Sequence, residues 1–500
     1  MLETPTLPDI LAARAASEPE TVAMIVHGSG ELTFGRWQAR SNAVAHDLLN
    51  RGVRRGDRVG LVYPGSGWID YAVAFLGVLK AGAVAVPMSD RMPAAEIEQI
   101  AAHCSASVIL TGRDGPPPEG GAGSSTSPPE GRAGSSTSPP EGSRPPLEGS
   151  MSPPEVTLRP ADMAQILYTS GTTGKAKGVA ATHANLAFGA RTQPRRRAFA
   201  HSRHLVHAFP IGTNAGQMML VNALTAHPAV VTLPRFTPGR FAALIERHRA
   251  GTVFLVPAMA VELLNLQEGP DLSSVLLLGS AAAPLPPAVA SGLTRMFPKA
   301  TITNYYTSTE AAPAQTIMLF DPDRPDSVGR SAAGGDVRIA SPEGADLPPG
   351  QTGEVWMRSP AAPRSYYDDP AASTEVFRGG WIRMGDLGYL DDDGYLYLVD
   401  RDGDVVKSGA FKVSTLKVEN ALYEHPAVVE AAAYGLPHHV LGTTVAAAVV
   451  LRTEVPDADI RAFLRDRLAQ HEIPSEIVRM ESLPRNRGGK VDKRALRARA

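Results

Sequence analysis

Residues 168–178, which read YTSGTTGKAKG, concentrate the side chains best suited to holding phosphate. The stretch contains three glycines, four hydroxyl side chains and two lysines. Glycine-rich turns present backbone N–H groups to anions, and hydroxyl and ammonium groups add donors and positive charge. A surface loop without function is the alternative, but lysines beside the glycines favour a phosphate site. The residues predicted to contact phosphate are Thr169, Ser170, Gly171, Thr172, Thr173, Gly174 and Lys175.

The Walker A loop is the obvious comparison, and it does not fit. That pattern needs Gly, four residues, Gly-Lys and then Ser or Thr. Aligned on Gly174 and Lys175, its first glycine falls on Thr169 and its hydroxyl on Ala176. Residues 164–168 before the loop read as a short buried strand, and Thr182 behind it reads as the cap of a helix. The sequence therefore predicts a strand, a phosphate-binding loop and a helix.

Three further polar motifs follow in order: NYYTSTE at 304–310, Trp-Ile-Arg-Met-Gly-Asp at 381–386, and a Gly-Gly-Lys that ends at Lys490. Each of these motifs alone is weak evidence for a nucleotide site. A Gly-Asp pair is common in turns, and Lys490 lies in a basic tail where a solvated charge is the simpler interpretation. Their combination is the informative feature.

Together with the glycine loop, these motifs resemble the adenylate-forming superfamily of acyl-CoA synthetases, peptide-synthetase adenylation domains and luciferases, and look most like its acyl- or aryl-CoA ligases. The resemblance covers nearly the whole chain. It implies that Tyr306 stacks on adenine, that Thr309 contacts the α-phosphate and that Glu310 holds Mg²⁺, a hard cation that prefers carboxylate and phosphate oxygens. Asp386 would accept hydrogen bonds from both ribose hydroxyls. Arg401 would point towards the ribose or the phosphates.

Lys490 matches the catalytic lysine of the superfamily, which bridges the substrate carboxylate and the α-phosphate. The implied activity is ATP- and Mg²⁺-dependent formation of an acyl-adenylate with release of pyrophosphate, followed by thioester formation with CoA. Two alternatives stay open. The acyl group could pass to a carrier protein, or the acid could be unusual, such as nitrite; or the chain could be a non-catalytic member.

Several positions depart from the superfamily pattern. Thr307 replaces a glycine, and Gly403 stands where the hinge residue is usually Lys or Asp. Thr415 and Lys417 stand where Pro and Glu are expected. Glycine accepts unusual backbone angles, so a hinge at this point remains plausible.

The residues predicted to form the acid pocket differ most from the superfamily pattern. At 210–214 the usual Pro-x-Phe-His is Pro-Ile-Gly-Thr-Asn, and no acidic residue lies between 210 and 220. A desolvated substrate ammonium needs an anionic partner, so an α-amino acid is disfavoured. We predict a roomy or polar-walled pocket for an aryl or medium-chain acyl acid. Its predicted residues are Thr213, Asn214, Gly279, Ser280, Ala281 and Asn304.

Strand and helix patterns alternate over residues 1–112 and 164–320, which indicates α/β architecture with parallel sheets. We expect an adenylation domain at 1–400 made of two parallel-sheet subdomains and a small β-barrel module, a hinge at 401–403 and a mobile α+β lid domain at 404–500. Residues 113–155 contain AGSSTSPPEG twice, and their Pro, Gly, Ser and Glu composition predicts a disordered insertion.

Composition narrows the class of protein. The 500 residues are 43% hydrophobic and 20% charged, with a formal net charge of −2 that gives no general attraction to nucleic acid or anionic membrane. The single cysteine excludes an internal disulfide framework and suits a reducing cytoplasm. The first residues lack a basic and then apolar leader, and the apolar run at 71–88 is interrupted by Lys80. We therefore expect a cytoplasmic protein without a membrane span.

Overall fold

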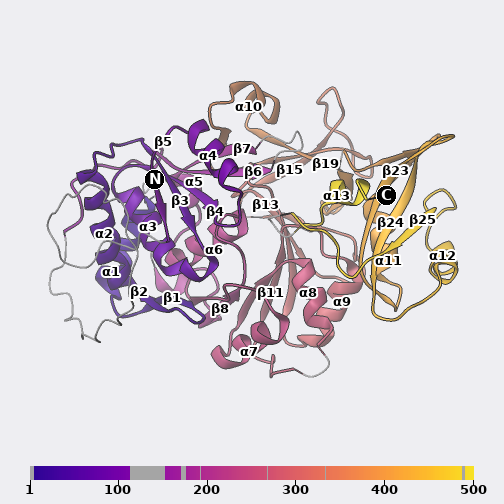
Figure 1. Ribbon diagram of the computed structural model, residues 1–500, viewed down its shortest axis with the longest axis horizontal. Coiled ribbons are helices and arrows are strands. Elements are labelled where there is room, and N and C mark those ends of the chain that lie inside the picture. Colours follow the sequence, from indigo (N-terminus) through magenta and orange to yellow (C-terminus); the bar gives the residue numbers. More distant parts are fainter. Residues whose placement is uncertain are drawn as a thin grey trace, which may run out of the picture.

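The computed structural model describes residues 5–112, 152–170, 176–191, 193–266, 269–332, 334–401, 403–486 and 490–499. Residues 171–175 of the glycine loop lie outside this part of the chain, as do the side chain of Ser170 and most of the predicted insertion at 113–155. Three sheets are built from residues up to Arg401, and a fourth begins at Val406. The fourth sheet lies at one end of the long axis of the molecule (Figure 1).

The first sheet has nine strands in the order β14-β13-β12-β11-β10-β8-β9-β1-β2. Its six central strands are parallel, and β2, β13 and β14 add antiparallel edges. The strands are β1 (Val22–Val26), β2 (Gly30–Thr33), β8 (His204–His207), β9 (Ala229–Thr232), β10 (Thr252–Leu255), β11 (Leu277–Ala281), β12 (Thr301–Tyr306), β13 (Gln315–Leu319) and β14 (Arg330–Ala332).

The second sheet has six strands in the order β17-β7-β6-β4-β3-β5. They are β3 (Arg58–Tyr63), β4 (Val84–Ser89), β5 (Ala106–Thr111), β6 (Met163–Ser170), β7 (Ala176–Thr182) and β17 (Ser365–Tyr366). The predicted strand, loop and helix is corrected here. The chain returns from the glycine loop as β7, antiparallel to β6, and the short helix α5 (His183–Leu186) begins only afterwards, capped by Thr182 as predicted. The loop thus joins two strands of a hairpin and does not lie at a helix N-terminus.

Helices cover both faces of the first sheet. The central core joins α1 (Leu7–Ser17), α2 (Phe34–Asn50), α3 (Trp68–Lys80) and α6 (Asn214–Thr225) to strands of both parallel sheets. On the other face pack α7 (Pro238–His248), α8 (Pro257–Leu264) and α9 (Pro287–Met296). Helix α4 (Ala94–His103) packs against the second sheet through Ile100. Short 3-10 turns occupy Gly65–Gly67 and Pro194–Arg196.

Helix α3 explains the longest apolar run of the chain. It contacts β3 and β4 of the second sheet and β1 of the first, so almost its whole circumference is buried. Its last residue, Lys80, is buried as well, and its Nζ donates to Oε1 of Gln38, Oγ of Ser41 and Oδ1 of Asn42, each at 2.7 Å. In the described part of the chain, no helix is both long enough and apolar enough to cross a membrane.

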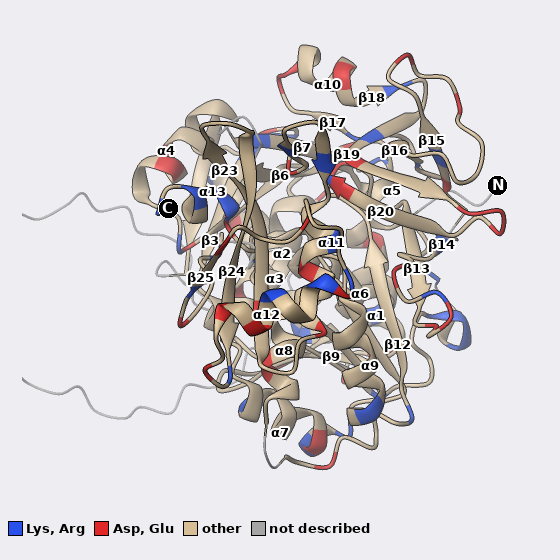
Figure 2. Ribbon diagram, turned by 90° about the vertical axis from the view of Figure 1, so that its right-hand side faces the viewer, with Lys and Arg blue, Asp and Glu red and all other residues tan. Residues whose placement is uncertain are grey.

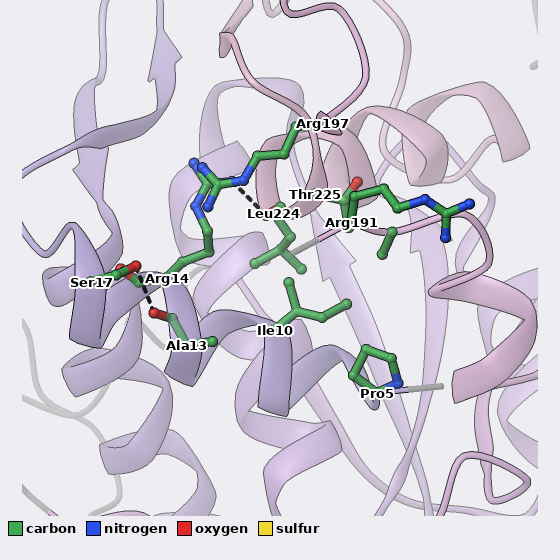
Figure 3. Close-up of a pocket in the computed structure, with 10 residues that line it drawn as sticks. Pro5, Ile10, Ala13, Arg14, Ser17, Arg191, Arg197, Leu224 and Thr225 are labelled. Carbon is green, nitrogen blue, oxygen red and sulfur yellow. Dashed lines mark hydrogen bonds between the residues drawn. The ribbon is translucent and has the colours of Figure 1, made fainter. Parts of the chain in front are cut away.

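A cavity of about 50 Å³ lies between α1, α6 and the segment around Arg191 (Figure 3). Beside it, Arg14 donates to the carbonyl oxygen of Leu224 at 3.0 Å and pairs with Glu18, which also pairs with Arg197, each at 2.7 Å. The ion pairs join α1 to Arg197, and the hydrogen bond to Leu224 joins α1 to the end of α6. None of the residues predicted to bind nucleotide or acid lines this cavity.

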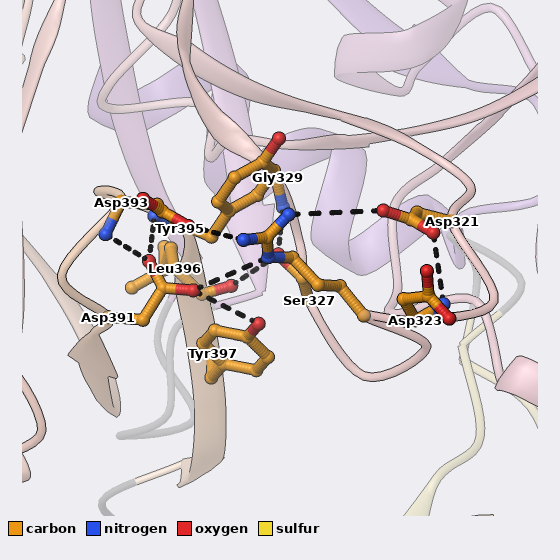
Figure 4. Close-up of polar contacts among 10 residues, drawn as sticks. Asp321, Asp323, Ser327, Gly329, Asp391, Asp393, Tyr395, Leu396 and Tyr397 are labelled. Atoms are coloured by element: carbon orange, nitrogen blue, oxygen red, sulfur yellow. Dashed lines mark hydrogen bonds and ion pairs between the residues drawn. The ribbon is translucent and has the colours of Figure 1, made fainter.

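The third sheet is antiparallel, with the order β15-β16-β19-β18 and β20 paired to β19. Its elements are β15 (Asp336–Ala340), β16 (Gly353–Arg358), β18 (Phe377–Arg378), β19 (Trp381–Leu390) and β20 (Leu396–Arg401), with α10 (Pro370–Val376) beside them. The β19–β20 turn is tied to the segment after β13 by Arg324, which pairs with Asp391 at 3.7 Å and with Asp393 and lies 4.4 Å from the ring centre of Tyr395 (Figure 4).

The fourth sheet has the order β22-β21-β24-β23 with β25 paired to β24. Its elements are β21 (Val406–Ser408), β22 (Phe411–Val413), β23 (Val428–His438), β24 (Gly442–Leu451), β25 (Glu476–Arg479), α11 (Thr415–Tyr423), α12 (Asp457–Arg465) and α13 (Lys493–Arg497). It has its own core, and α12 lies on its outer side with mixed charges (Figure 2). Helix α11 contacts α9 and β20 of the preceding part. The predicted mixed α/β fold with parallel sheets is confirmed.

Candidate active site

Three of the predicted nucleotide residues meet at the end of the β19–β20 hairpin. Asp386 and Arg401 are partners in its register, and Nε of Arg401 lies 3.4 Å from Oδ1 of Asp386. Tyr306, the last residue of β12, donates from its hydroxyl to Oδ2 of Asp386 at 2.7 Å. Burial and the carboxylate both raise the pKa of Tyr306, so its hydroxyl stays protonated and remains a donor. Each oxygen of Asp386 is therefore held by a different strand.

Glu310 and its neighbour Thr309 are each held by a residue that the sequence motifs did not include. Tyr366 donates from its hydroxyl to Oε1 of Glu310 at 3.0 Å. Arg364, which is 7% exposed, donates to the carbonyl oxygen of Thr309 at 2.8 Å. Burial lowers the pKa of Arg364 to about 10, and Glu310 opposes that shift. This arrangement leaves Oε2 of Glu310 without a hydrogen-bond partner among the described residues.

Lys490 reaches this cluster from the C-terminal part of the chain. Its backbone is fixed by Asn486, whose N–H donates to the carbonyl oxygen of Lys490 at 2.7 Å. Lys490 is exposed to solvent, although many protein atoms lie around its side chain. This desolvation lowers its pKa to about 8; Arg401 lowers it further, and Asp386 and Glu310 oppose the shift. Lys490 is therefore within electrostatic reach of Arg401, Asp386 and Glu310.

The base of the glycine loop lies next to the same cluster. Thr169 pairs with Lys177 across the β6–β7 hairpin, and Nζ of Lys177 lies 4.9 Å from the ring centre of Tyr366. Tyr366 therefore contacts both Glu310 and the strand that leaves the loop. The predicted contacts of residues 171–175 and of the Ser170 side chain lie outside the described residues.

The predicted acid-pocket residues divide between the two faces of the first sheet. Ser280 and Asn304 are register partners on β11 and β12. Side chains alternate along a strand, so these two share a face with the core residues Leu278 and Ile302, whereas Gly279 lies on the face of Tyr305. Oγ of Ser280 and Oδ1 of Asn304 are buried and have no hydrogen-bond partner among the described residues.

An unpartnered buried acceptor is costly. Oδ1 of Asn304 thus suits an N–H donor from a bound group, and the exocyclic amino group of adenine is such a donor. The residues present therefore fit an adenine nucleotide, and the place of Asn304 among the acid contacts stays a prediction.

The space beside Gly279 is occupied by aromatic rings. A Cβ atom on this residue would lie 2.5 Å from Cε1 of Phe254 and 2.9 Å from Cε2 of Tyr305, so the two rings already fill the space that the missing side chain leaves. Thr213 is also occupied, because its hydroxyl caps α6 by accepting from the N–H of Gly216 and donates to the carbonyl oxygen of Pro210. Asn214 begins α6, next to this cap.

Residues that depart from the superfamily pattern near the hinge have structural partners. The N–H of Thr415 donates to Oδ2 of Asp400 at 2.5 Å, a bond that the expected proline could not make. Nζ of Lys417 pairs with Glu472 at 2.7 Å. Gly403 has no atom within 4 Å of the position a Cβ would take, so its space is open.

Comparison with known proteins decides the family. The profile described as AMP-binding enzyme matches residues 11–367, and that of the AMP-binding enzyme C-terminal domain matches residues 417–490. The chain belongs to the AMP-binding enzyme family. It is an AMP-forming ligase.

Curated relatives match over nearly their whole length. A probable CoA ligase of Humulus lupulus is 30% identical over 98% of this chain and 95% of its own. The feruloyl-CoA synthase of an Amycolatopsis species is 31% identical over 97% of each chain. Among solved structures, ATP-bound MatB from Rhodopseudomonas palustris has a TM-score of 0.80 and 27% identity over 98% of each chain. The anthranilate CoA ligase AuaEII, solved in complex with anthranoyl-AMP, shares the fold. It is 24% identical and has a TM-score of 0.82 over 100% of this chain and 98% of its own.

Proposed function

We propose that this AMP-binding enzyme is an acid–CoA ligase, which activates a carboxylic acid as an acyl-adenylate and then forms the CoA thioester. The proposal is carried by the electrostatic coupling of Lys490, which lies between β25 and α13, to Glu310 after β12 and to Asp386 and Arg401 on the third sheet. A cation placed beside two carboxylates and an arginine can neutralise charge that develops on a phosphate held between them.

In the first reaction, a carboxylate oxygen of the acid attacks the α-phosphorus of ATP. A new oxygen–phosphorus bond forms, the bond between the α-phosphorus and the bridging oxygen breaks, and pyrophosphate leaves. The chain contributes position and charge. Lys490 in its ammonium form would pair with the attacking carboxylate and an α-phosphate oxygen. Thr309, whose carbonyl oxygen is fixed by Arg364, would donate from its hydroxyl to the same phosphate.

Asp386 and Tyr306 would hold the nucleoside. The two residues are already joined by their hydrogen bond, so the ribose and adenine sites are fixed relative to each other. Glu310 would hold Mg²⁺ through Oε2, and this ion would neutralise the phosphate oxygens. The hairpin strands β6 and β7 would carry the glycine loop over the β- and γ-phosphates.

In the second reaction the CoA sulfur attacks the acyl carbonyl carbon. A carbon–sulfur bond forms, the bond between the acyl carbon and the phosphate oxygen of AMP breaks, and the thiol proton passes to solvent. CoA ligases among the curated relatives support this acceptor. Gly409, with a φ of +58° at the β21–β22 turn, and its neighbours would line the approach of the thiol after the C-terminal part has turned.

For the acid we propose an aryl or medium-chain acyl group without an ammonium group. Phe254 and Tyr305, whose ring centres lie 5.5 Å apart, form an aromatic wall beside Gly279. Helix α6 contains no acidic residue that could pair with an ammonium. An apolar wall without a counter-charge favours an uncharged side group on the acid.

A panel of acids tests the proposal, with pyrophosphate and CoA-thioester measured separately in reactions with and without CoA. We expect release with benzoate- or cinnamate-type acids and hexanoate, no release with phenylalanine, and thioester only when CoA is present. Acid-dependent release without thioester would favour a carrier protein or another acceptor. Absence of release with every acid, nitrite included, would contradict the ligase assignment in favour of a non-catalytic member.

A further inference from the structure

Glu310 is positioned by a part of the chain far from its own motif. Tyr366 belongs to β17, a two-residue strand that pairs with β7 through Ser365 opposite Ala180 and Tyr366 opposite Val179. This pairing adds β17 to the edge of the sheet that carries the glycine loop. Its tyrosine crosses to the first sheet and donates to Oε1 of Glu310 at 3.0 Å.

The direction of this hydrogen bond is fixed. Tyr366 is 9% exposed. A phenol hydroxyl can donate and a carboxylate oxygen accepts, so the proton of this bond comes from Tyr366. One oxygen of Glu310 is thus occupied, and the lone pairs of Oε2 have no hydrogen-bond donor among the described residues.

Lys177 connects this arrangement to the glycine loop. It lies on β7 two residues after the loop segment 171–175, and its ammonium is 4.9 Å from the ring centre of Tyr366. A cation over an aromatic face is attracted to the ring. Lys177 therefore contacts the face of the ring whose hydroxyl holds Glu310.

We propose that Tyr366 is a positioning residue that orients Glu310 for a divalent cation, with Lys177 of β7 over its ring. The inference rests on the proposed function, because it assigns the cation to Glu310. Tyr366 itself touches neither the nucleotide nor the acid in this proposal. Its hydroxyl turns Oε2 of Glu310 towards the phosphates, and its ring supports the strand on which the loop ends.

A merely structural role would reside in the ring, which packs with Val179, Ala372 and Phe377. The substitution Tyr366→Phe keeps this packing and removes only the hydroxyl. A neighbouring matched control is Tyr367→Phe, because the Tyr367 hydroxyl has no hydrogen-bond partner among the described residues. Thermal unfolding of both variants would be compared with the parent protein to verify that the fold is kept.

The test measures metal affinity directly. Mn²⁺ would be titrated into the protein saturated with a non-hydrolysable ATP analogue, and free Mn²⁺ followed by electron paramagnetic resonance. Loss of a group that orients a metal ligand typically weakens metal binding by about 10- to 100-fold. We expect Tyr366→Phe to weaken Mn²⁺ binding by roughly 10-fold, Glu310→Gln to weaken it at least as much, and Tyr367→Phe to leave it unchanged.

The inference would be overturned if Tyr366→Phe bound Mn²⁺ as tightly as the parent protein does. It would also be overturned if Glu310→Gln left the Mn²⁺ affinity unchanged. Pyrophosphate release by the parent protein, measured on the acid panel, tests the proposed function separately. A parent protein that releases pyrophosphate while Tyr366→Phe binds Mn²⁺ normally would therefore reject the positioning role and keep the ligase.

Discussion

The hydroxyl of Tyr306 donates a 2.7 Å hydrogen bond to Oδ2 of Asp386, a residue 80 positions further along the chain. This bond joins the end of a parallel strand in the first sheet to an antiparallel hairpin in the third. The proposed contacts to adenine and to ribose are therefore parts of one rigid unit, and Arg401 closes it from the other side of the carboxylate.

Substituting Tyr306 by Phe should weaken the binding of ATP without abolishing it. The ring that would stack on adenine remains, whereas Asp386 loses one of its two partners. A hydrogen bond to a charged group contributes about 1.5–3 kcal/mol, so we expect ATP affinity to fall by roughly 10- to 100-fold. Calorimetric titration with ATP measures it. Unchanged affinity would show that Arg401 alone orients Asp386.

Removing the ammonium of Lys490 should affect chemistry far more than nucleotide binding. Lys490→Ala is expected to keep ATP binding and to lose roughly 10²–10³ in the rate of adenylation, the range found when one charge-stabilising group is removed. Acid-dependent pyrophosphate release measures the loss, and calorimetry with ATP provides the control. Near-normal release from this variant would reject Lys490 as the catalytic lysine.

The pH dependence of adenylation should report the same group. The pKa of Lys490 is lowered to about 8, and only the protonated form carries the charge that the reaction needs. We expect kcat/KM to be constant below this pKa and to fall as the pH rises through about 8, because this ratio reports ionisations of the free enzyme.

The matched variant for this profile is Lys490→Arg. A guanidinium stays protonated throughout this range, so whatever activity the variant retains should no longer fall near pH 8. If the activity of both proteins fell together near pH 8, the group that ionises there would be a residue other than Lys490.

The aromatic wall of the acid pocket can be tested at Gly279. In Gly279→Ala the new methyl group would lie 2.5 Å from Phe254 and 2.9 Å from Tyr305, so both rings must move. We expect kcat/KM for aryl acids to fall by about 10-fold or more, since small misplacements near the reacting atoms are costly, while ATP affinity stays the same. An equal effect on every acid in the panel would place Gly279 outside the acid pocket.

Local patterns predicted the parts of the fold that depend on neighbouring residues. Thr182 was predicted to be the cap of a helix, and its hydroxyl caps α5. The alternating strands and helices gave the parallel sheets. By contrast β7 was missed, because Lys177 and Gly178 interrupt the apolar pattern that identifies a strand, and pairing with β6 stabilises it instead.

Contacts between distant segments could not be predicted in this way. Motif spacing predicted Glu310, and it predicted Asp386 together with Tyr306 and Arg401. It did not predict Tyr366 and Arg364, which hold Glu310 and the carbonyl oxygen of Thr309. Tyr366 lies on a two-residue strand that exists only because β7 offers an edge, and no local signal marks so short an element. The division of Ser280 and Gly279 between two faces follows from alternation, which a prediction based on the run of small residues ignored.

The separate core of the fourth sheet has a consequence for optical measurements. All four tryptophans of the chain, Trp37, Trp68, Trp356 and Trp381, precede β21. Tryptophan emission during denaturation therefore reports on the first three sheets and not directly on the sheet that brings in Lys490. A variant with a tryptophan at Tyr423, which packs against the core of the fourth sheet and that of α7–α9, would make the detachment of the C-terminal part visible by fluorescence.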